Sequence, residues 1–294
     1  MYHRVVDLDL DPYSLAVSPK NFDKQIRFLK KYFNIIGMEQ LRESLTKGTL
    51  PGRSVVITFD DGYYDNLLKA KPILEKYQAP AIFFVTTGMI DKNEEFWWDQ
   101  LEKIFLSKKV RPKNLELNIG KRYYSWELKT KEHVKTAFKN IYSLFRYMPS
   151  SIRDDALKYL LDWAEVGVEQ RDTHRTMNYD EIKELITGGL CSIGAHTMTH
   201  CSLAFESLDK QEWEIKESKR RLTEINGEEI YDFAYPFGQK EDFSSETIKI
   251  IKKVGFKSVM TTLSGNVYSS TDLYNMPRRF IVNSTPLRSF FLMR

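Results

Sequence analysis

Short apolar runs alternate with segments of helical periodicity along most of the chain. The runs are rich in β-branched and aromatic residues and predict strands at 2–6, 55–59, 81–85, 191–195, 231–235, 256–261 and 278–282. Between them, recurring apolar positions predict helices at 18–33, 38–45, 65–77, 209–226 and 244–254. Strands that alternate with helices indicate βα units around a parallel sheet, so we expect an α/β fold. Seven or so such units can close into a barrel, with its functional side chains after the carboxyl ends of the strands.

Residues with known capping preferences mark the ends of several predicted helices. Ser18 is a candidate N-cap, and Pro19 suits the first helical position. Asp209 and Glu212 have the spacing of a capping box, which predicts the start of a long helix. Gly227 follows that helix and is expected to end it.

One region breaks the alternation of strands and helices. Between about residues 89 and 178, strand signals are few, and helical periodicity is clear in 131–148 and 151–164. We expect a helical insertion packed on the barrel, within a single domain that spans residues 1–294. Trp97 and Trp98 fall in this region, and they fit either core positions or an aromatic wall for a sugar ring.

Composition excludes several classes of protein. The chain has the 42% hydrophobic and 29% charged residues of an ordinary globular protein. Its net charge of +4 comes from basic residues spread along the chain, so nothing indicates nucleic-acid binding. Two cysteines, Cys191 and Cys201, form no disulfide framework. No apolar run predicts a membrane span, and the start "YHRVVDLDLD" does not resemble a signal peptide, so we expect a cytoplasmic protein, at most peripheral to a membrane.

Two carboxylates stand side by side where the predicted strand 55–59 ends, in the stretch "TFDDG". Adjacent carboxylates repel each other and lose hydration when buried, so Asp60 and Asp61 call for an explanation. A turn is one explanation, because Asp-Gly is a common turn dipeptide. A cation held between carboxylates and other ligands is the other.

Two histidines in "HTMTH", His196 and His200, follow the predicted strand 191–195. On a helical turn this spacing directs both imidazoles to the same side, where they can share a metal ion, although an isolated pair is more often a polar loop. The ends of parallel strands lie on one rim, so the histidines and the two aspartates are expected to meet. Two imidazoles and one carboxylate leave open positions on a divalent ion, as in catalytic sites. One aspartate then binds the metal while its neighbour acts as a base.

Together, "TFDDG" and "HTMTH" resemble the first two motifs of the polysaccharide deacetylase family, the NodB homology domain of carbohydrate esterase family four. The stretch "FAYPFG" is similar to the family's third motif. This resemblance covers most of the chain outside the insertion. It implies a distorted, TIM-like (β/α)7 barrel and a metal-dependent hydrolase that acts on an N-acylated amino sugar.

The resemblance also implies roles for individual residues. Asp60 matches the general base, and Asp61, His196 and His200 match the ligands of one divalent ion. Zinc is the usual ion in the family, and cobalt or nickel often serves. Phe237 matches the residue whose backbone N–H helps to hold the tetrahedral oxyanion.

The chain departs from the family pattern in two places. The arginine that usually begins the third motif and orients the base is missing, and we expect Arg278 rather than Arg279 to replace it, the alternative being a surface arginine pair. The late histidine that usually serves as the general acid is also missing, because no histidine follows His200. A barrel brings its first and last strands together, so we expect His3 to be the acid. The alternative is that His3 only supports Asp60 or the metal ligands.

We therefore expect an N-deacetylase whose partner is a carbohydrate, either a polysaccharide or a glycan precursor. An N-deformylase of a carrier-linked formamido sugar uses the same chemistry and remains open, as does a less favoured O-deacetylase. A catalytically silent carbohydrate-binding barrel is the alternative from another class. The missing arginine and histidine allow it, whereas the intact base and ligands argue against it.

Overall fold

The computed structural model describes residues 1–107, 112–286 and 288. The chain divides into two compact units, of which the first combines Met1–Lys92 with Thr176–Arg294 and the second is Asn93–Arg175. All the residues with an expected role in catalysis or metal binding belong to the first unit. No helix within the described ranges is long and apolar enough to cross a bilayer.

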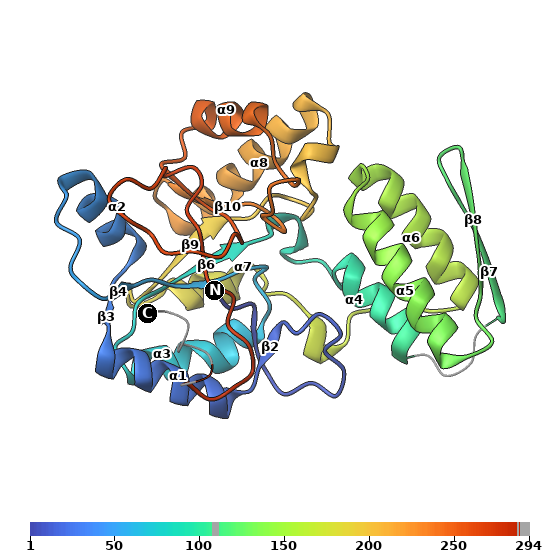
Figure 1. The fold of residues 1–294 in the computed structure, drawn as a ribbon, viewed down its shortest axis with the longest axis horizontal. Helices are drawn as coiled ribbons and strands as arrows, with labels where there is room; N and C mark the ends of the chain where they lie inside the picture. Colours follow the sequence, from blue (N-terminus) through green and yellow to red (C-terminus); the bar gives the residue numbers. More distant parts are fainter. Residues whose placement is uncertain (108–111, 287, 289–294) are drawn as a thin grey trace. The chain divides into compact units, whose positions relative to one another are not determined.

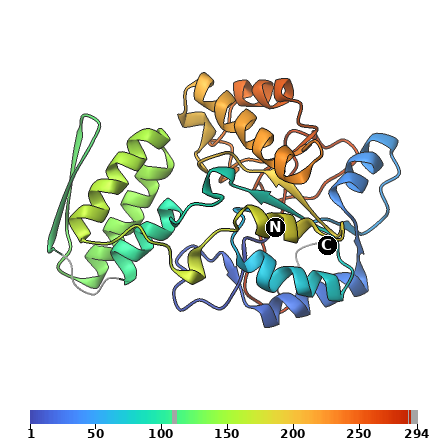
Figure 2. The ribbon, with the colours of Figure 1, turned by 180° about the vertical axis from the view of Figure 1, so that it is seen from behind.

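A parallel sheet of five strands forms the centre of the first unit (Figures 1 and 2). Its spatial order is β11 (Ser258–Met260), β10 (Asp232–Ala234), β9 (Cys191–Ala195), β6 (Ala81–Val85) and β5 (Ile57–Phe59). Phe59 lies opposite Phe83, and Val85 lies opposite Ala195. Because the strands run the same way, their carboxyl ends share one edge, as the alternating pattern predicted.

Short strand pairs extend this curled sheet toward a barrel. β1 (Arg4–Val5) pairs with β2 (Ala16–Val17), and β3 (Asn34–Ile35) pairs with β4 (Ser54–Val55). A bridge between Tyr2 and Phe59 connects the start of the chain to β5. The barrel wall on this side is therefore short and irregular.

The first and last described segments meet at the remaining side of the barrel. The Ile281 N–H donates to the Met1 carbonyl at 3.1 Å, and the Met1 amine donates to the Arg279 carbonyl at 2.8 Å. The strand predicted at 278–282 is wrong, because this segment has no regular ladder. Isolated backbone hydrogen bonds take the place of a strand there.

Amphipathic helices surround the sheet, with α1 beside α3 and α8 beside α9 (Figure 1). They are α1 (Pro19–Tyr32), α2 (Met38–Lys47), α3 (Lys71–Lys76), α7 (Tyr179–Ile186), α8 (Leu208–Asn226) and α9 (Ser245–Val254). Short segments of π-helix (η1, Asn66–Ala70) and 3-10 helix (η2, Thr87–Met89; η5, Leu203–Phe205) complete the unit. Helix α1 buries Phe22, Ile26 and Leu29, and the ring of Phe22 meets that of Phe59 edge-on at 5.7 Å.

The helix ends follow most of the capping signals. The Ser18 side chain caps α1. Gly227 ends α8 in a left-handed conformation, with φ 76°. The capping box predicted for Asp209 and Glu212 is wrong, because the side chain of Ser207 caps α8 instead.

The second unit is mainly helical, as expected, but it also contains a hairpin that the sequence did not lead us to predict. Its helices are α4 (Trp97–Glu102), η3 (Lys103–Ser107, π-helical), α5 (Lys131–Arg146), α6 (Ser150–Ala164) and η4 (Asp172–His174, 3-10). The hairpin consists of β7 (Asn114–Ile119) and β8 (Arg122–Glu127), which pair antiparallel. Leu115 and Leu117 are buried while their neighbours are exposed, an alternation that is typical of a half-buried strand. The packing of the insertion on the barrel stays a prediction.

Trp97 and Trp98 are core residues of the second unit. Only 5% and 4% of their surfaces are exposed. Trp98 stacks on Phe96 at 4.3 Å, and Trp97 lies 6.1 Å from Phe145 between ring centres. Buried indoles offer no face to a sugar, so the aromatic-wall interpretation is not supported.

Candidate active site

The predicted metal ligands come together at the carboxyl edge of the sheet. Asp61 lies just after β5, and His196 and His200 lie after β9, with β6 between the two strands. Asp61 Oδ1 lies 3.6 Å from His196 Nε2 and 3.3 Å from His200 Nε2. All three side chains are buried. Asp61 Oδ1 and the two Nε2 atoms lie within 4.8 Å of one another, which is close enough to share one cation.

One hydrogen bond fixes the orientation of His196. Its Nδ1 lies 2.8 Å from the carbonyl oxygen of Ala234, at the end of β10. A carbonyl only accepts, so Nδ1 carries the proton and Nε2 presents its lone pair toward Asp61. Burial lowers the pKa of His196 to about 4, so this imidazole is neutral at pH 7.

The turns that carry these side chains adopt left-handed backbone conformations. The φ angles are 77° at Asp61, 63° at Thr197, 51° at His200 and 59° at Phe237. Non-glycine residues rarely adopt this region, and they tend to do so at functional sites. The expected helical turn at "HTMTH" is wrong, because the segment forms a bend in which the Thr197 hydroxyl accepts from the His200 N–H at 3.0 Å. The two imidazoles converge through this bend.

Asp61 itself indicates that a cation fits the group. Its Oδ1 is buried and has no hydrogen-bond partner among the described residues. A buried acceptor without a donor costs about 1–3 kcal/mol, and burial raises the pKa of Asp61. A divalent ion would compensate this charge, and one carboxylate with two imidazoles is a donor set that zinc and similar ions accept.

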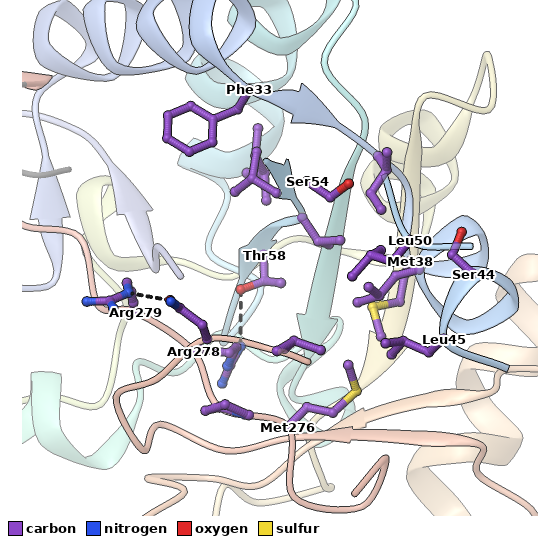
Figure 3. A pocket seen from close by; sticks show the side chains of 18 of the residues that line it. Phe33, Met38, Ser44, Leu45, Leu50, Ser54, Thr58, Met276, Arg278 and Arg279 are labelled. Atoms are coloured by element: carbon purple, nitrogen blue, oxygen red, sulfur yellow. Dashed lines mark hydrogen bonds between the residues drawn. The ribbon is translucent and has the colours of Figure 1, made fainter. Parts of the chain in front are cut away.

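The neighbouring carboxylate, Asp60, is held by Arg278. Two parallel hydrogen bonds of 2.7 Å join Arg278 Nη1 and Nη2 to the two oxygens of Asp60. Arg278 also donates to the Thr261 carbonyl at 2.8 Å. It donates to the Thr58 hydroxyl at 3.3 Å as well (Figure 3). Burial alone raises the pKa of Asp60, but Arg278 outweighs it and holds this pKa well below its ordinary range. Asp60 is therefore ionised and fixed in orientation.

His3 lies near the same carboxylates. Its pKa responds to several neighbours: burial lowers it most, Asp61 and Asp60 raise it, and the net pKa is lower than 6.5. The ring of Phe280 lies 5.5 Å from the His3 ring. The His3 Nδ1 is buried and has no hydrogen-bond partner within the described part of the chain. Burial therefore opposes protonation of this imidazole, whereas the two carboxylates favour it.

The third motif also reaches the site. The ring of Phe237 meets the ring of His200 edge-on at 4.8 Å. The Phe237 carbonyl accepts from the hydroxyl of Thr262. At Gly238, with φ 63°, a Cβ would lie 2.7 Å from the Thr262 nitrogen, so glycine is required. The proposed use of the Phe237 N–H stays a prediction.

Several residues of the site carried no recognised signal in the sequence. Arg4 binds Asp65 at 3.0 Å and lies over the ring of Tyr63 at 4.2 Å, and its charge acts on Asp61. Glu214 binds the backbone between the two histidines. Such contacts join residues that are distant in sequence, and no local pattern indicates them.

A cavity of about 650 Å³ lies in the first unit, and it is not the candidate active site. Figure 3 shows that most of its walls are apolar, with Phe33, Met38 and Leu50 among them. None of the predicted metal ligands lines it. Arg278 and Arg279 both border this cavity, but Arg279 donates to Asn266 at 3.1 Å, whereas Arg278 binds Asp60.

The second unit contains another group of buried potential ligands, Asp99, Glu102 and His174. The positive charge in this group comes from the guanidinium of Arg171, which binds Glu102 at 2.8 Å and Glu95 at 2.8 Å. His174 Nε2 lies 3.4 Å from Glu102. We interpret this group as a buried ion-pair network that holds the ends of the unit together.

A model of the polysaccharide deacetylase family matches residues 47–109 and 168–259, which is more than half of the chain. The chain belongs to the polysaccharide deacetylase family. The matched ranges include both aspartates, both histidines and Phe237. His3 and Arg278 lie outside them.

Relatives with the family's chemistry in their names align with nearly all of the chain. The poly-β-1,6-N-acetyl-D-glucosamine N-deacetylase of Escherichia coli (strain K12) is 22% identical over 296 residues, covering 98% of this chain and 37% of the relative. The chain thus spans little more than a third of that relative. A Bacillus subtilis (strain 168) protein described as a polysaccharide deacetylase is 22% identical over 95% of this chain and 68% of its own length.

A solved structure confirms the fold class. The Streptococcus pyogenes deacetylase PplD, in complex with acetate, matches with a TM-score of 0.64 and 22% identity. The match covers 98% of this chain and 95% of that protein. The curled parallel sheet is therefore the distorted barrel expected for the family.

The first prediction concerns metal content. Protein purified without chelators should contain about one equivalent of a divalent ion, and His196→Ala should lose it, because removal of a ligand weakens binding strongly. Elemental analysis of both proteins measures this. The control is His133→Ala, since His133 is a partly exposed histidine in the second unit. Full metal content in His196→Ala would contradict the assignment and would direct attention to Asp99, Glu102 and His174.

Proposed function

We propose that this chain is a metal-dependent hydrolase that removes the N-acetyl group from an amino sugar in a polysaccharide or glycan precursor. The observation that carries the proposal is the pair of adjacent aspartates in different environments. Asp61 faces the two histidines, whereas Asp60 is kept off them by Arg278. A ligand and a base held side by side are what metal-assisted amide hydrolysis requires.

Asp61, His196 and His200 would hold the ion. We propose zinc, with cobalt or nickel as alternatives that accept the same donors. When bound, such an ion acts as a Lewis acid and lowers the pKa of water. Asp61 supplies a negative charge to the ion, and the Ala234 carbonyl keeps His196 in the tautomer that binds through Nε2.

Asp60 is the proposed base. Its low pKa keeps the carboxylate ionised over the working range of pH. Each oxygen uses one lone pair for Arg278 and retains another that can accept the proton of the attacking water. Arg278 thus fixes the direction of the base and lowers its proton affinity at the same time.

His3 is proposed to protonate the leaving amine, and Phe237 is proposed to stabilise the oxyanion. The leaving amine must receive a proton before the C–N bond breaks, and a histidine close to Asp60 and Asp61 can deliver it. The backbone N–H of Phe237 is proposed to donate to the developing oxyanion. The contact between Phe237 and His200 supports a position close to the ligands.

The comparisons favour acetyl as the acyl group. The Escherichia coli relative is named for an N-acetylglucosamine polymer, and the Streptococcus pyogenes relative binds acetate, the acid that deacetylation releases. An N-deformylase remains the alternative with the same machinery. The Arg278–Asp60 pair supplies the tether that the third motif lacks, and this weakens the case for a silent carbohydrate-binding barrel. The expected cytoplasmic location stays a prediction.

A substrate screen tests the proposal. Metal-loaded protein is incubated with poly-β-1,6-N-acetyl-D-glucosamine oligomers and with free or carrier-linked acetamido and formamido sugars. Released amine and released acetate or formate are then quantified. Acetate release that requires Asp60 supports the proposal. Formate release alone would establish the deformylase, and saturable sugar binding without amine release would establish the silent barrel.

The base assignment predicts the behaviour of Asp60→Asn. The amide is not a base, so turnover should fall by roughly 10²–10⁴-fold while metal content stays at the wild-type level. Arg278→Ala should cause a smaller loss, because the carboxylate remains but is no longer fixed in direction. Steady-state kinetics and elemental analysis measure both effects, and Arg279→Ala is the control. If Asp60→Asn loses the metal and excess zinc restores turnover, Asp60 is a ligand.

The acid assignment predicts a change in pH dependence for His3→Ala. Protonated His3 is the active form, so wild-type turnover should fall as pH rises through a pKa that burial holds below 6.5. His3→Ala should lose this basic limb and should keep its metal. A substrate whose leaving group needs no proton is the control, and His3→Ala should hydrolyse it at close to the wild-type rate. Equal slowing on both substrates would contradict the assignment.

A further inference from the structure

A buried glutamate on α8 binds the turn between the two histidine ligands. Glu214 has no exposed surface. Its Oε2 accepts from the N–H groups of Met198 at 2.8 Å and Thr199 at 2.9 Å. Its Oε1 accepts from the Thr199 hydroxyl at 2.8 Å. One carboxylate therefore takes three hydrogen bonds from two consecutive residues of the "HTMTH" turn.

These hydrogen bonds stabilise a backbone segment that has no regular secondary structure of its own. Thr197 and His200 both have positive φ angles, and the segment between them forms no helical turn. If Glu214 were removed, the N–H groups of Met198 and Thr199 would lose their acceptor, which would destabilise this conformation of the turn. Charge-assisted hydrogen bonds are stronger than neutral ones, so the carboxylate suits this position better than an amide.

The same helix also holds the adjacent turn after β6. Arg221 Nη1 donates to the Thr87 carbonyl at 2.8 Å. The Thr87 N–H donates to the Thr197 carbonyl at 3.0 Å, and the Gly88 N–H donates to the Met198 carbonyl at 2.8 Å. The two turns are thus joined to each other and to one face of α8.

The approach of the two turns leaves no room for a side chain. A Cβ on Gly88 would lie 2.1 Å from the Met198 carbonyl oxygen. The turn after β9 is therefore constrained from the sheet side by Gly88 and from the helix side by Glu214. Lys210, one helical turn before Glu214, lies 3.1 Å from its carboxylate and balances the buried charge.

We propose that Glu214 is a positioning residue for the metal ligands, acting through the backbone of residues 197–199. By fixing this turn it sets the separation and direction of the His196 and His200 imidazoles before any ion binds. This role rests on the proposed metal site. Residues that contact the metal ligands but not the metal orient those ligands, and their loss typically weakens metal affinity by about 10–100-fold.

The experiment compares Glu214→Gln with Glu212→Gln. Glu212 lies on the same helix, is partly exposed and pairs with Lys253 at 2.8 Å, so it is the matched control. Cobalt affinity is measured by competition with a chelator, and the visible spectrum of the bound cobalt reports the ligand geometry. Glu214→Gln should weaken cobalt binding by about 10–100-fold and alter the spectrum, whereas Glu212→Gln should match the wild type.

A second variant covers the case in which Glu214→Gln does not fold. Thr199→Val removes only the hydroxyl hydrogen bond and should weaken cobalt binding by a smaller factor, with the same direction of spectral change. Wild-type affinity and spectrum in a folded Glu214→Gln protein would overturn the proposal. If Glu214→Gln does not fold, wild-type cobalt affinity and spectrum in Thr199→Val would also overturn the proposal. If the wild-type protein binds no cobalt through His196 and His200, the metal site itself fails, which is a distinct result.

Discussion

The buried ion pair between Asp60 and Arg278 is the contact on which the rest of the site depends. It joins the end of β5 to a segment 218 positions later and uses both oxygens of the carboxylate. Loss of one partner from a buried pair leaves an uncompensated charge and typically costs about 3–5 kcal/mol. The same contact ties the segment around Arg278 to the end of β5 and holds the proposed base away from the proposed metal ligands. Stability and chemistry are therefore coupled at one point.

The parallel sheet explains why so few residues suffice to build the site. Strands β5, β6 and β9 end at one edge, so the turns that follow them meet without long loops. These turns require left-handed backbone conformations at Asp61, Thr197 and His200, and the surrounding hydrogen bonds stabilise them. The regular sheet thus supplies the location, and the strained turns supply the direction of each side chain.

The sequence was most informative where structure is local. Hydrophobic periodicity located β6, β9 and most helices, and adjacent motifs located the aspartates and histidines. Contacts between distant segments were harder to predict. Arg278 was inferred from a missing partner, whereas Glu214 was missed because its acceptor role depends on the packing of α8 against a turn. The 278–282 segment looked like a strand because its apolar residues suit one, but it meets the first segment through isolated hydrogen bonds.

The separation of Arg278 from the ligands in the chain has a consequence for folding. The aspartates and histidines follow the ends of β5 and β9 in the central sheet, whereas Arg278, the partner of Asp60, lies near the end of the described chain. The contacts among Asp61, His196 and His200 therefore do not involve the segment that fixes the direction of Asp60. A chain in which this segment is undocked keeps the side chains of the proposed metal site, yet its proposed base Asp60 lacks the arginine that orients it.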